Sequence, residues 1–266
     1  MERGNQKMKR RDLLATSCLA TAAPLLGAAA EAAEDQSARE FYELRRYTTA
    51  GEAQQQALAT FLQQAAVSAL NRAGVGPVGL FEELEGEKAV VFALLPHKSL
   101  ESVVGLQGKL EADAGYQAAG ASVLNTPKAE PAYQRIESWL LQAFSHMPKR
   151  VAPEKKDSRI FELRTYESHS EKMGLKKIEM FNDGGEIDLF RRVGLQAVFF
   201  GQTLFGTQLP NLTYLLAFDD MADHDADWKR FLEDPGWLEL RGKAEYKDTV
   251  SHITKTFLRP LPGSQL

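Results

Sequence analysis

The sequence predicts an α+β fold made of two tandem ferredoxin-like (βαββαβ) units. The first observation is an internal repeat, because Glu-Leu-Arg-Arg-Tyr at residues 43–47 returns as Glu-Leu-Arg-Thr-Tyr at residues 162–166, an offset of 119 residues. In both copies the side chains alternate between two faces, as in a strand, and a helical pattern follows. The second observation is the order of elements after each copy, which is helix, strand, strand, helix and strand. That order is typical of ferredoxin-like units.

The first unit spans residues 41–142. Its opening strand, Phe41–Tyr47, is followed by a Thr-x-x-Glu capping pattern at Thr49 and by a helix that Gly74 ends. Later elements are expected as strands at 77–84 and 89–95, a helical region at 99–124 and a strand at 133–141. Pro96 is expected to stop the third strand, because proline cannot donate a ladder hydrogen bond.

The second unit spans residues 160–259 and follows a charged, proline-containing linker at residues 143–159. Its capping pattern starts at Ser168, and Gly184-Gly185 should interrupt its first helix before Gly194 ends it. The other expected elements are strands at 161–166, 195–203, 212–218 and 252–258 and helices at 223–231 and 234–250, with residues 260–266 as a tail.

Each predicted sheet has helices on one face only, so its other face must be buried. We expect the two units to pack these faces together as an intramolecular dimeric α/β barrel. In both repeated strands the apolar side chains share one face, which we place under the helices. The opposite face would then point into the barrel and supply the candidate site, which consists of Glu43, Arg45, Tyr47, Glu162, Arg164 and Tyr166.

Two interpretations of these six side chains are open. They could line a pocket for a small hydrophobic ligand, with carboxylate and phenol groups available for proton transfer. Alternatively, the Glu and Arg on each strand could form a buried ion pair that fixes strand register and carries out no chemistry. The presence of the set in both units favours the second interpretation, and no catalytic residue is assigned.

The N-terminus predicts export. Residues 1–30 combine a basic start, the pair Arg10-Arg11 and an Ala-rich apolar run that ends in small residues. This pattern is typical of a secretory signal of the twin-arginine type with cleavage near Ala30, whether translation begins at Met1 or Met8. Residues 31–40 would form a flexible leader. We therefore expect a periplasmic or other extracytoplasmic protein with no stable membrane insertion after cleavage.

The composition argues against several classes of partner and site. The formal net charge is -4 and basic residues are dispersed, so nucleic acid is a poor partner. The single cysteine, Cys18, lies in the predicted signal, so the mature chain would have no thiol. The five histidines lack metal-ligand spacing, and no metal or cofactor is predicted.

Haem is the one cofactor kept as an alternative, with His224 or His252 as the iron ligand. The absence of a Soret band after haem titration would exclude it. The acidic residues at 219–227 are expected to cap a helix, and Trp228 and Trp237 to be core aromatics.

The strand Phe-Glu-Leu-Arg-Thr-Tyr at 161–166, the glycine after the following helix and the segment Phe-Leu-Glu-Asp-Pro-Gly-Trp at 231–237 together resemble the NIPSNAP family. Residues 160–259 resemble it more clearly than 41–142, which lacks the Asp-Pro-x-Trp segment. The resemblance implies the barrel fold expected above, which is shared with antibiotic-biosynthesis monooxygenases, muconolactone isomerases and chlorite-dismutase-like proteins. It implies no established reaction and no catalytic residues.

The expected function is therefore that of a small-molecule-binding or structural module. The alternative is a cofactor-independent oxygenase or isomerase that acts on a small hydrophobic substrate between the sheet and the helices. Exposed sheet edges could also pair chains into a homo-oligomer.

Overall fold

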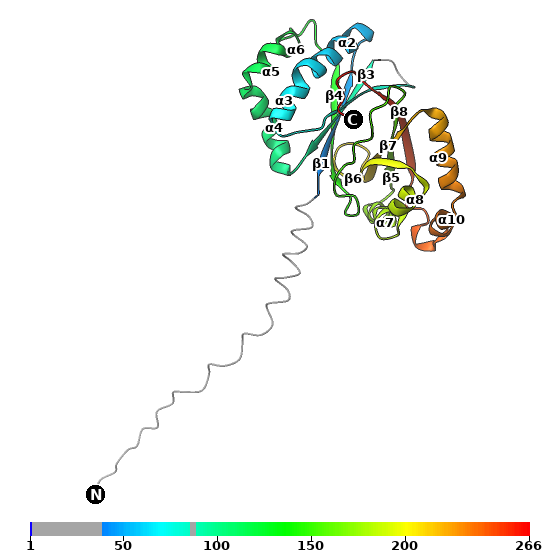
Figure 1. Ribbon diagram of the computed structural model, residues 1–266. Helices are drawn as coiled ribbons and strands as arrows, with labels where there is room; N and C mark the ends of the chain where they lie inside the picture. Colours follow the sequence, from blue (N-terminus) through cyan, green and yellow to red (C-terminus); the bar gives the residue numbers. More distant parts are fainter. Residues whose placement is uncertain (2–38, 86–88) are drawn as a thin grey trace. The chain divides into compact units, whose positions relative to one another are not determined.

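The computed structural model describes Met1 and residues 39–85 and 89–266. Eight strands form a closed antiparallel barrel in the order β1-β3-β2-β8-β5-β7-β6-β4 (Figure 1). This arrangement confirms the predicted α+β fold of two ferredoxin-like halves. The strands are β1 (Phe41–Thr48), β2 (Gly79–Glu83), β3 (Val90–His97), β4 (Arg135–Ala143), β5 (Ile160–Glu167), β6 (Gln196–Phe205), β7 (Asn211–Phe218) and β8 (His252–Pro260).

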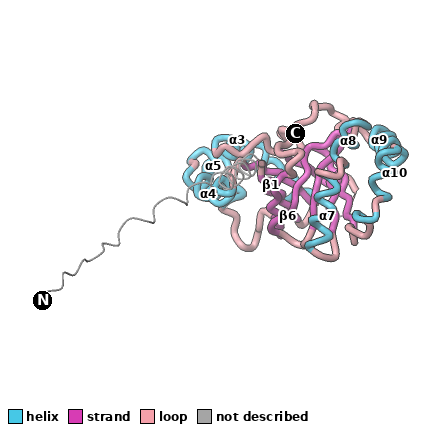
Figure 2. Tube along the Cα trace, turned by 90° about the horizontal axis from the view of Figure 1, so that it is seen from below, coloured by secondary structure: helices cyan, strands magenta, loops and turns pink. Residues whose placement is uncertain are grey.

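The helices lie outside the barrel, with those of the first half on one side and those of the second half on the other (Figure 2). The first half has a helix that passes through one π-helical turn, followed by three shorter helices: α2 (Glu52–Phe61), η1 (Leu62–Ala66), α3 (Val67–Arg72), α4 (Leu100–Ala112), α5 (Ala114–Ala119) and α6 (Ala121–Leu124). The second half has α7 (Glu171–Phe181), α8 (Glu186–Val193), α9 (Met221–Glu233), α10 (Pro235–Gly242) and the 3-10 turn η2 (Ala244–Tyr246).

Glycine decides where the principal helices stop. Gly74, Gly185 and Gly194 have φ values of 87°, 90° and 91°, a left-handed conformation that glycine adopts without steric cost. The expected helix ends at Gly74 and Gly194 and the interruption at Gly184-Gly185 are thus confirmed. The last predicted helix was too long, since α10 ends at Gly242 and Lys243 is already extended.

Two local predictions were wrong. Pro96 lies within β3, because β2 pairs with β3 only as far as Leu94 and β1 alone pairs with it beyond. The capping patterns also fail, since Thr49 donates its hydroxyl to the carbonyls of Gly51 and Ala89. In the second half the cap of α7 is Ser170, which accepts from the amide of Met173.

The barrel interior is an apolar core that both halves share. It consists of Tyr42, Leu44, Phe81, Val90, Phe92, Leu94, Leu141, Ala143, Phe161, Leu163, Val198, Phe199, Leu215, Ala217, Leu258 and Leu266. Phe81 on β2 and Phe161 on β5 meet edge to face with 5.0 Å between ring centroids. The two halves therefore bury their apolar sheet faces against each other, as predicted, but the faces themselves are the reverse of those expected.

The apolar face of each repeated strand points into the barrel, and the Glu, Arg and Tyr side chains point out toward the helices. Tyr47 and Tyr166 pack in the two outer cores, which lie between the sheet and the helices. The physical reason is that a buried carboxylate needs hydrogen-bond partners. The middle of the barrel is apolar, whereas on the outer face Glu162 finds Trp228 of α9 and Glu43 finds Arg45 and Ser138.

The described residues from 39 to 266 belong to one compact unit. No helix or strand lies between Ala143 and Ile160, yet Phe144 and Met147 in that segment are buried. The last residues also pack closely, since Leu266 joins the barrel core and Ser264 accepts from the amide of Leu80. Every described strand has two partners, but β2 pairs with β8 only over Phe81–Glu83, so the first part of β8 has no described strand on that side. Homo-oligomer formation stays a prediction.

The predicted signal and most of the predicted leader lie outside the described residues. Within the part of the chain that the structure describes, no helix is both long and apolar enough to cross a membrane.

Replacing Phe81 with Ala should lower the free energy of unfolding by about 3–5 kcal/mol, because a fully buried ring that joins the two halves is lost. Urea unfolding followed by circular dichroism measures the change. Phe205→Ala is the matched control, since Phe205 is 70% exposed. A loss below about 1 kcal/mol at Phe81 would contradict the shared core, because core Phe→Ala changes exceed it.

Candidate functional site

The second half contains a cavity of about 390 Å³ between the outer face of the sheet and helices α8, α9 and α10. The sheet supplies the predicted set Glu162, Arg164 and Tyr166 together with β8. The full lining is Glu162, Arg164, Tyr166, Glu186, His224, Trp228, Phe231, Leu232, Trp237, Lys255 and Phe257. Aromatic rings form most of the walls, and a few charged groups converge among them, which is typical of small-molecule sites.

Glu162 is the polar centre of this cavity and is fully buried. Its Oε1 accepts from Arg164 Nη1 at 3.1 Å, and its Oε2 accepts from Trp228 Nε1 at 2.8 Å. The guanidinium of Arg164 also lies over the Trp228 ring, 4.2 Å from its centroid, in a cation–π arrangement. Strand β5 and helix α9 thereby hold the three side chains in one fixed cluster.

Three nitrogen atoms on the lining are buried without a hydrogen-bond partner among the described residues: Arg164 Nε, His224 Nε2 and Trp237 Nε1. His224 Nε2 lies 3.4 Å from Glu162 Oε2, and its Nδ1 lies 2.9 Å from the carboxylate of Asp225. Arginine and tryptophan nitrogens can only donate, and an unpaired buried donor costs about 1–3 kcal/mol. The cavity therefore offers donors to a ligand that brings acceptor oxygens.

Two residues of the lining, Tyr166 and Glu186, each bind a buried side chain that is not part of the lining. Tyr214 donates its hydroxyl to that of Tyr166 at 2.9 Å, and burial raises the pKa of both phenols. Lys177 Nζ lies 2.7 Å from Glu186 Oε2. Burial raises the pKa of Glu186, although the neighbouring Lys177 acts in the opposite direction. Both phenols consequently remain protonated at neutral pH and can serve as hydrogen-bond donors.

The equivalent space in the first half is much smaller. There Arg45 and Tyr47 line a cavity of about 40 Å³ together with Phe61 and Tyr116. Arg45 donates two hydrogen bonds to Glu43, from Nε at 2.7 Å and from Nη2 at 2.9 Å. Here the Glu–Arg set acts as a closed ion pair, whereas the second copy lines an open cavity.

The structure thus brings Glu162, Arg164 and Tyr166 together, but not in the barrel interior where they were expected. It adds His224, Trp228 and Trp237, of which both tryptophans had been assigned to the core. The expected helix cap by the acidic segment is confirmed, since Asp220 accepts from the amide of Asp223. The missed signal was the spacing of His224, Trp228 and Phe231 on α9, which places all three on one helix face.

Among the residues that the structure describes, no group of three or more His, Cys, Asp or Glu side chains could hold a metal ion. The two histidines kept as alternative haem ligands differ in exposure and in their position relative to the cavity. His252 is exposed on β8, whereas the His224 side chain is 13% exposed and lines the cavity. Of these two histidines, His224 is the one on the cavity wall, and haem stays an alternative to the prediction that no cofactor is bound.

The NIPSNAP family model matches residues 161–265. The second half is a NIPSNAP domain. The barrel fold is also found in a candidate monooxygenase from Fusobacterium nucleatum, at 9% identity, with a TM-score of 0.55 and coverage of 84% of this chain and 93% of that one. A candidate monooxygenase from Lactobacillus acidophilus is similar at 9% identity, with a TM-score of 0.56 and coverage of 84% and 94%.

A NIPSNAP-like protein from Burkholderia xenovorans matches 40% of this chain and 89% of its own, at 20% identity and a TM-score of 0.37. No curated protein matches the sequence. The two full-length likenesses show the fold, in which two ferredoxin-like halves close one barrel. The cavity beside Glu162 lies in the NIPSNAP domain, since all its lining residues fall within the matched range.

Changing Glu43 to Gln tests the closed ion pair of the first half. Burial acts to raise the pKa of Glu43, but His97 and Arg45 outweigh it and bring the pKa to about 2. A lowered folded-state pKa stabilises the protein above the unfolded-state value and loses that effect as pH falls toward 2. The variant should therefore lose roughly 3 kcal/mol of stability at neutral pH, and progressively less at acidic pH.

Urea unfolding of both proteins between pH 2.5 and pH 7 measures this difference. Glu137→Gln is the matched control, because the Glu137 side chain is 34% exposed and its ion pair with Arg46 should add less. A pH-independent difference between wild type and the Glu43 variant would refute the charge-based explanation.

Proposed function

We propose that the NIPSNAP domain binds a small aromatic ligand with acceptor oxygens in the cavity beside Glu162. The observation that carries the proposal is the set of unpaired buried nitrogens in an aromatic-walled space. Arg164 Nε and Trp237 Nε1 can each donate one hydrogen bond, and Phe231, Phe257 and the two tryptophans supply apolar contact. A planar ligand with a carbonyl or phenolic oxygen would accept these hydrogen bonds and pack against these rings.

Charge balance also favours an uncharged ligand. Arg164 is already paired with Glu162, and Lys177 with Glu186, so the buried charges compensate each other. A charged ligand would have no buried counterion, which is costly in a low-dielectric site, because the remaining cation on the lining, Lys255, is exposed to solvent. The predicted export signal would place such binding outside the cytoplasm.

A matched pair of probes tests the proposal: 2-acetylnaphthalene, which carries one carbonyl acceptor, and naphthalene, which carries none. Isothermal titration calorimetry should show that the ketone binds more tightly, since it pairs a buried donor. Trp237→Phe keeps an aromatic ring but removes the Nε1 donor. The preference for the ketone should then fall about tenfold, as expected for an unpaired buried donor.

Phe205→Leu is the control, because Phe205 is 70% exposed and lines neither this cavity nor the one at the end of the barrel. It should leave binding of both probes unchanged. Equal affinity of wild type for the two probes, or no binding of either, would reject the proposal.

A second candidate function is proton transfer to or from the bound ligand, which is a first step in cofactor-independent oxygenase and isomerase chemistry. The observation that favours it is the geometry of His224. Its Nδ1 contacts Asp225, and its Nε2 is unpaired at the cavity wall near Glu162. A carboxylate that orients a histidine whose other nitrogen is free is the usual arrangement of a general base.

The methyl ketone of 2-acetylnaphthalene also tests this candidate. If His224 acts as a base, wild type should exchange the methyl protons for deuterium in D₂O faster than buffer alone, as followed by NMR. His224→Asn should slow the enzymatic exchange by about 100-fold, the lower range of general-base effects. The variant must still bind the ketone. No exchange above buffer in wild type would leave ligand binding as the function of the domain.

A further inference from the structure

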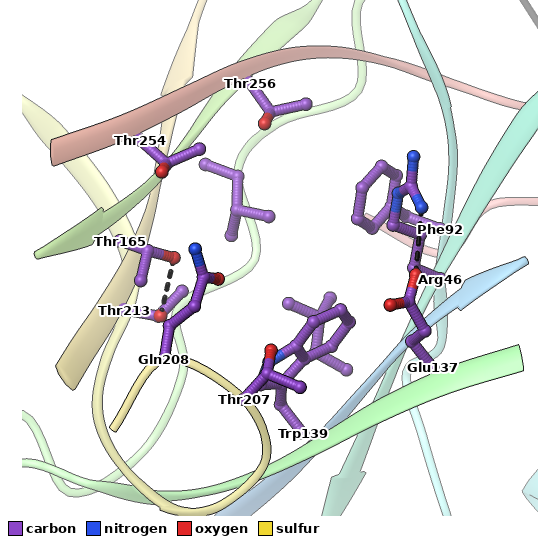
Figure 3. Close-up of a pocket in the computed structure, with 12 residues that line it drawn as sticks. Arg46, Phe92, Glu137, Trp139, Thr165, Thr207, Gln208, Thr213, Thr254 and Thr256 are labelled. Carbon is purple, nitrogen blue, oxygen red and sulfur yellow. Dashed lines mark hydrogen bonds and ion pairs between the residues drawn. The ribbon is translucent and has the colours of Figure 1, made fainter. Parts of the chain in front are cut away.

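A second cavity, of about 470 Å³, opens at one end of the barrel, inside the ring of strands (Figure 3). It lies on the opposite face of β5 from the cavity described above, since Leu163 and Thr165 line it while Glu162, Arg164 and Tyr166 line the other. The lining is Leu44, Arg46, Phe92, Glu137, Trp139, Leu163, Thr165, Thr207, Gln208, Thr213, Thr254 and Thr256. Its volume lies within the usual range of ligand sites, roughly 300–1,000 Å³.

The two halves supply different chemistry at matching strand positions. Figure 3 shows threonines of β5, β7 and β8 on one side of the cavity and Arg46, Glu137 and Trp139 of the first half on the other. Thr165 and Thr213 share a hydrogen bond of 2.9 Å between their hydroxyls. Among the described residues the hydroxyls of Thr254 and Thr256 have no partner, so they can serve a ligand as donors or acceptors.

The cavity has no uncompensated charge on its lining. Arg46 Nη1 lies 2.9 Å from Glu137 Oε2, which neutralises both groups while leaving further lone pairs and N–H bonds available. Leu44, Phe92 and Leu163 belong to the barrel core and give the cavity an apolar floor. A charged ligand therefore finds no counterion, whereas a neutral ligand with many hydroxyls finds partners of both kinds.

The loop between β6 and β7 completes the wall in a strained conformation. Gln208 has a φ of 60°, which is uncommon for a residue other than glycine, and its Nε2 donates to Glu167 Oε1 at 3.1 Å. Gly206 brings the loop against Trp139, because an added Cβ would lie 2.3 Å from its Cδ1. Backbone strain of this kind is concentrated at ligand sites, where it positions a side chain.

We infer that the barrel-end cavity binds a neutral, hydroxyl-rich small molecule, a saccharide or polyol. The threonine hydroxyls, the Gln208 amide and the Arg46–Glu137 pair would bind its hydroxyl groups, and Trp139 with the apolar floor would contact its C–H faces. This inference is independent of the proposed function, because the two cavities share no residue.

Saturation-transfer NMR with maltose tests the inference, with cyclohexanol as a ring of similar shape that carries one hydroxyl. Maltose should give protein-dependent signals and cyclohexanol none. The double variant Thr254→Val, Thr256→Val keeps side-chain shape but removes two hydroxyls, and it should weaken maltose binding about tenfold. Thr60→Val on the exposed surface of α2 is the matched control and should bind as wild type.

Gln208→Gly separates a binding role from a structural one. Glycine adopts the positive φ freely, so the melting temperature should stay at or above that of wild type while maltose binding weakens. The inference is overturned if neither maltose nor glucose binds wild type at tens of millimolar, if cyclohexanol binds as well as maltose, or if the threonine and Gln208 variants bind as wild type does.

Discussion

The structure depends on one constraint, which is that each four-stranded sheet has an apolar face that its own helices do not cover. The two halves satisfy it together by closing a single barrel, in which Phe81 and Phe161 meet at 5.0 Å across the interior. Closure also covers part of each sheet edge, since β2 pairs with β8 over Phe81–Glu83 and β4 pairs with β6 over Leu140–Ala143. Once the interior is apolar, the polar set of each repeated strand must lie outside it, under the helices.

That placement explains why the two copies of one motif have different surroundings. On the outer face the helices determine what a Glu–Arg pair meets. In the first half, the cavity that Phe61 and Tyr116 help to line is only about 40 Å³, and Arg45 binds Glu43 through two hydrogen bonds. In the second half, Trp228 takes one oxygen of Glu162, so Arg164 binds through a single nitrogen and its Nε stays unpaired. The same residues are thus structural in one half and accessible to a ligand in the other.

The two halves also differ on the inner face of the barrel, where they line the cavity at its end. Equivalent strands of the two halves line this cavity. The first half contributes the Arg46–Glu137 ion pair and the indole of Trp139, and the second half contributes threonine hydroxyls. Each copy of the duplicated unit thus has an inner strand face, toward the barrel, and an outer one, toward the helices. The differences between the copies, rather than the motif that they share, mark where a ligand could bind.

The amino-acid sequence determined the repeat, the order of strands and helices and the positions of the main helix ends, because these depend on local periodicity and on glycine. It also indicated that Glu162 and Arg164 would pair, since they lie two residues apart on one strand. The tertiary structure decided which strand face is interior, because that choice depends on partners supplied by distant helices. It also decided that His224, Trp228 and Trp237 join the repeated strand. On the outer, Glu–Arg–Tyr face, the second copy adjoins a cavity of about 390 Å³ and the first copy one of about 40 Å³.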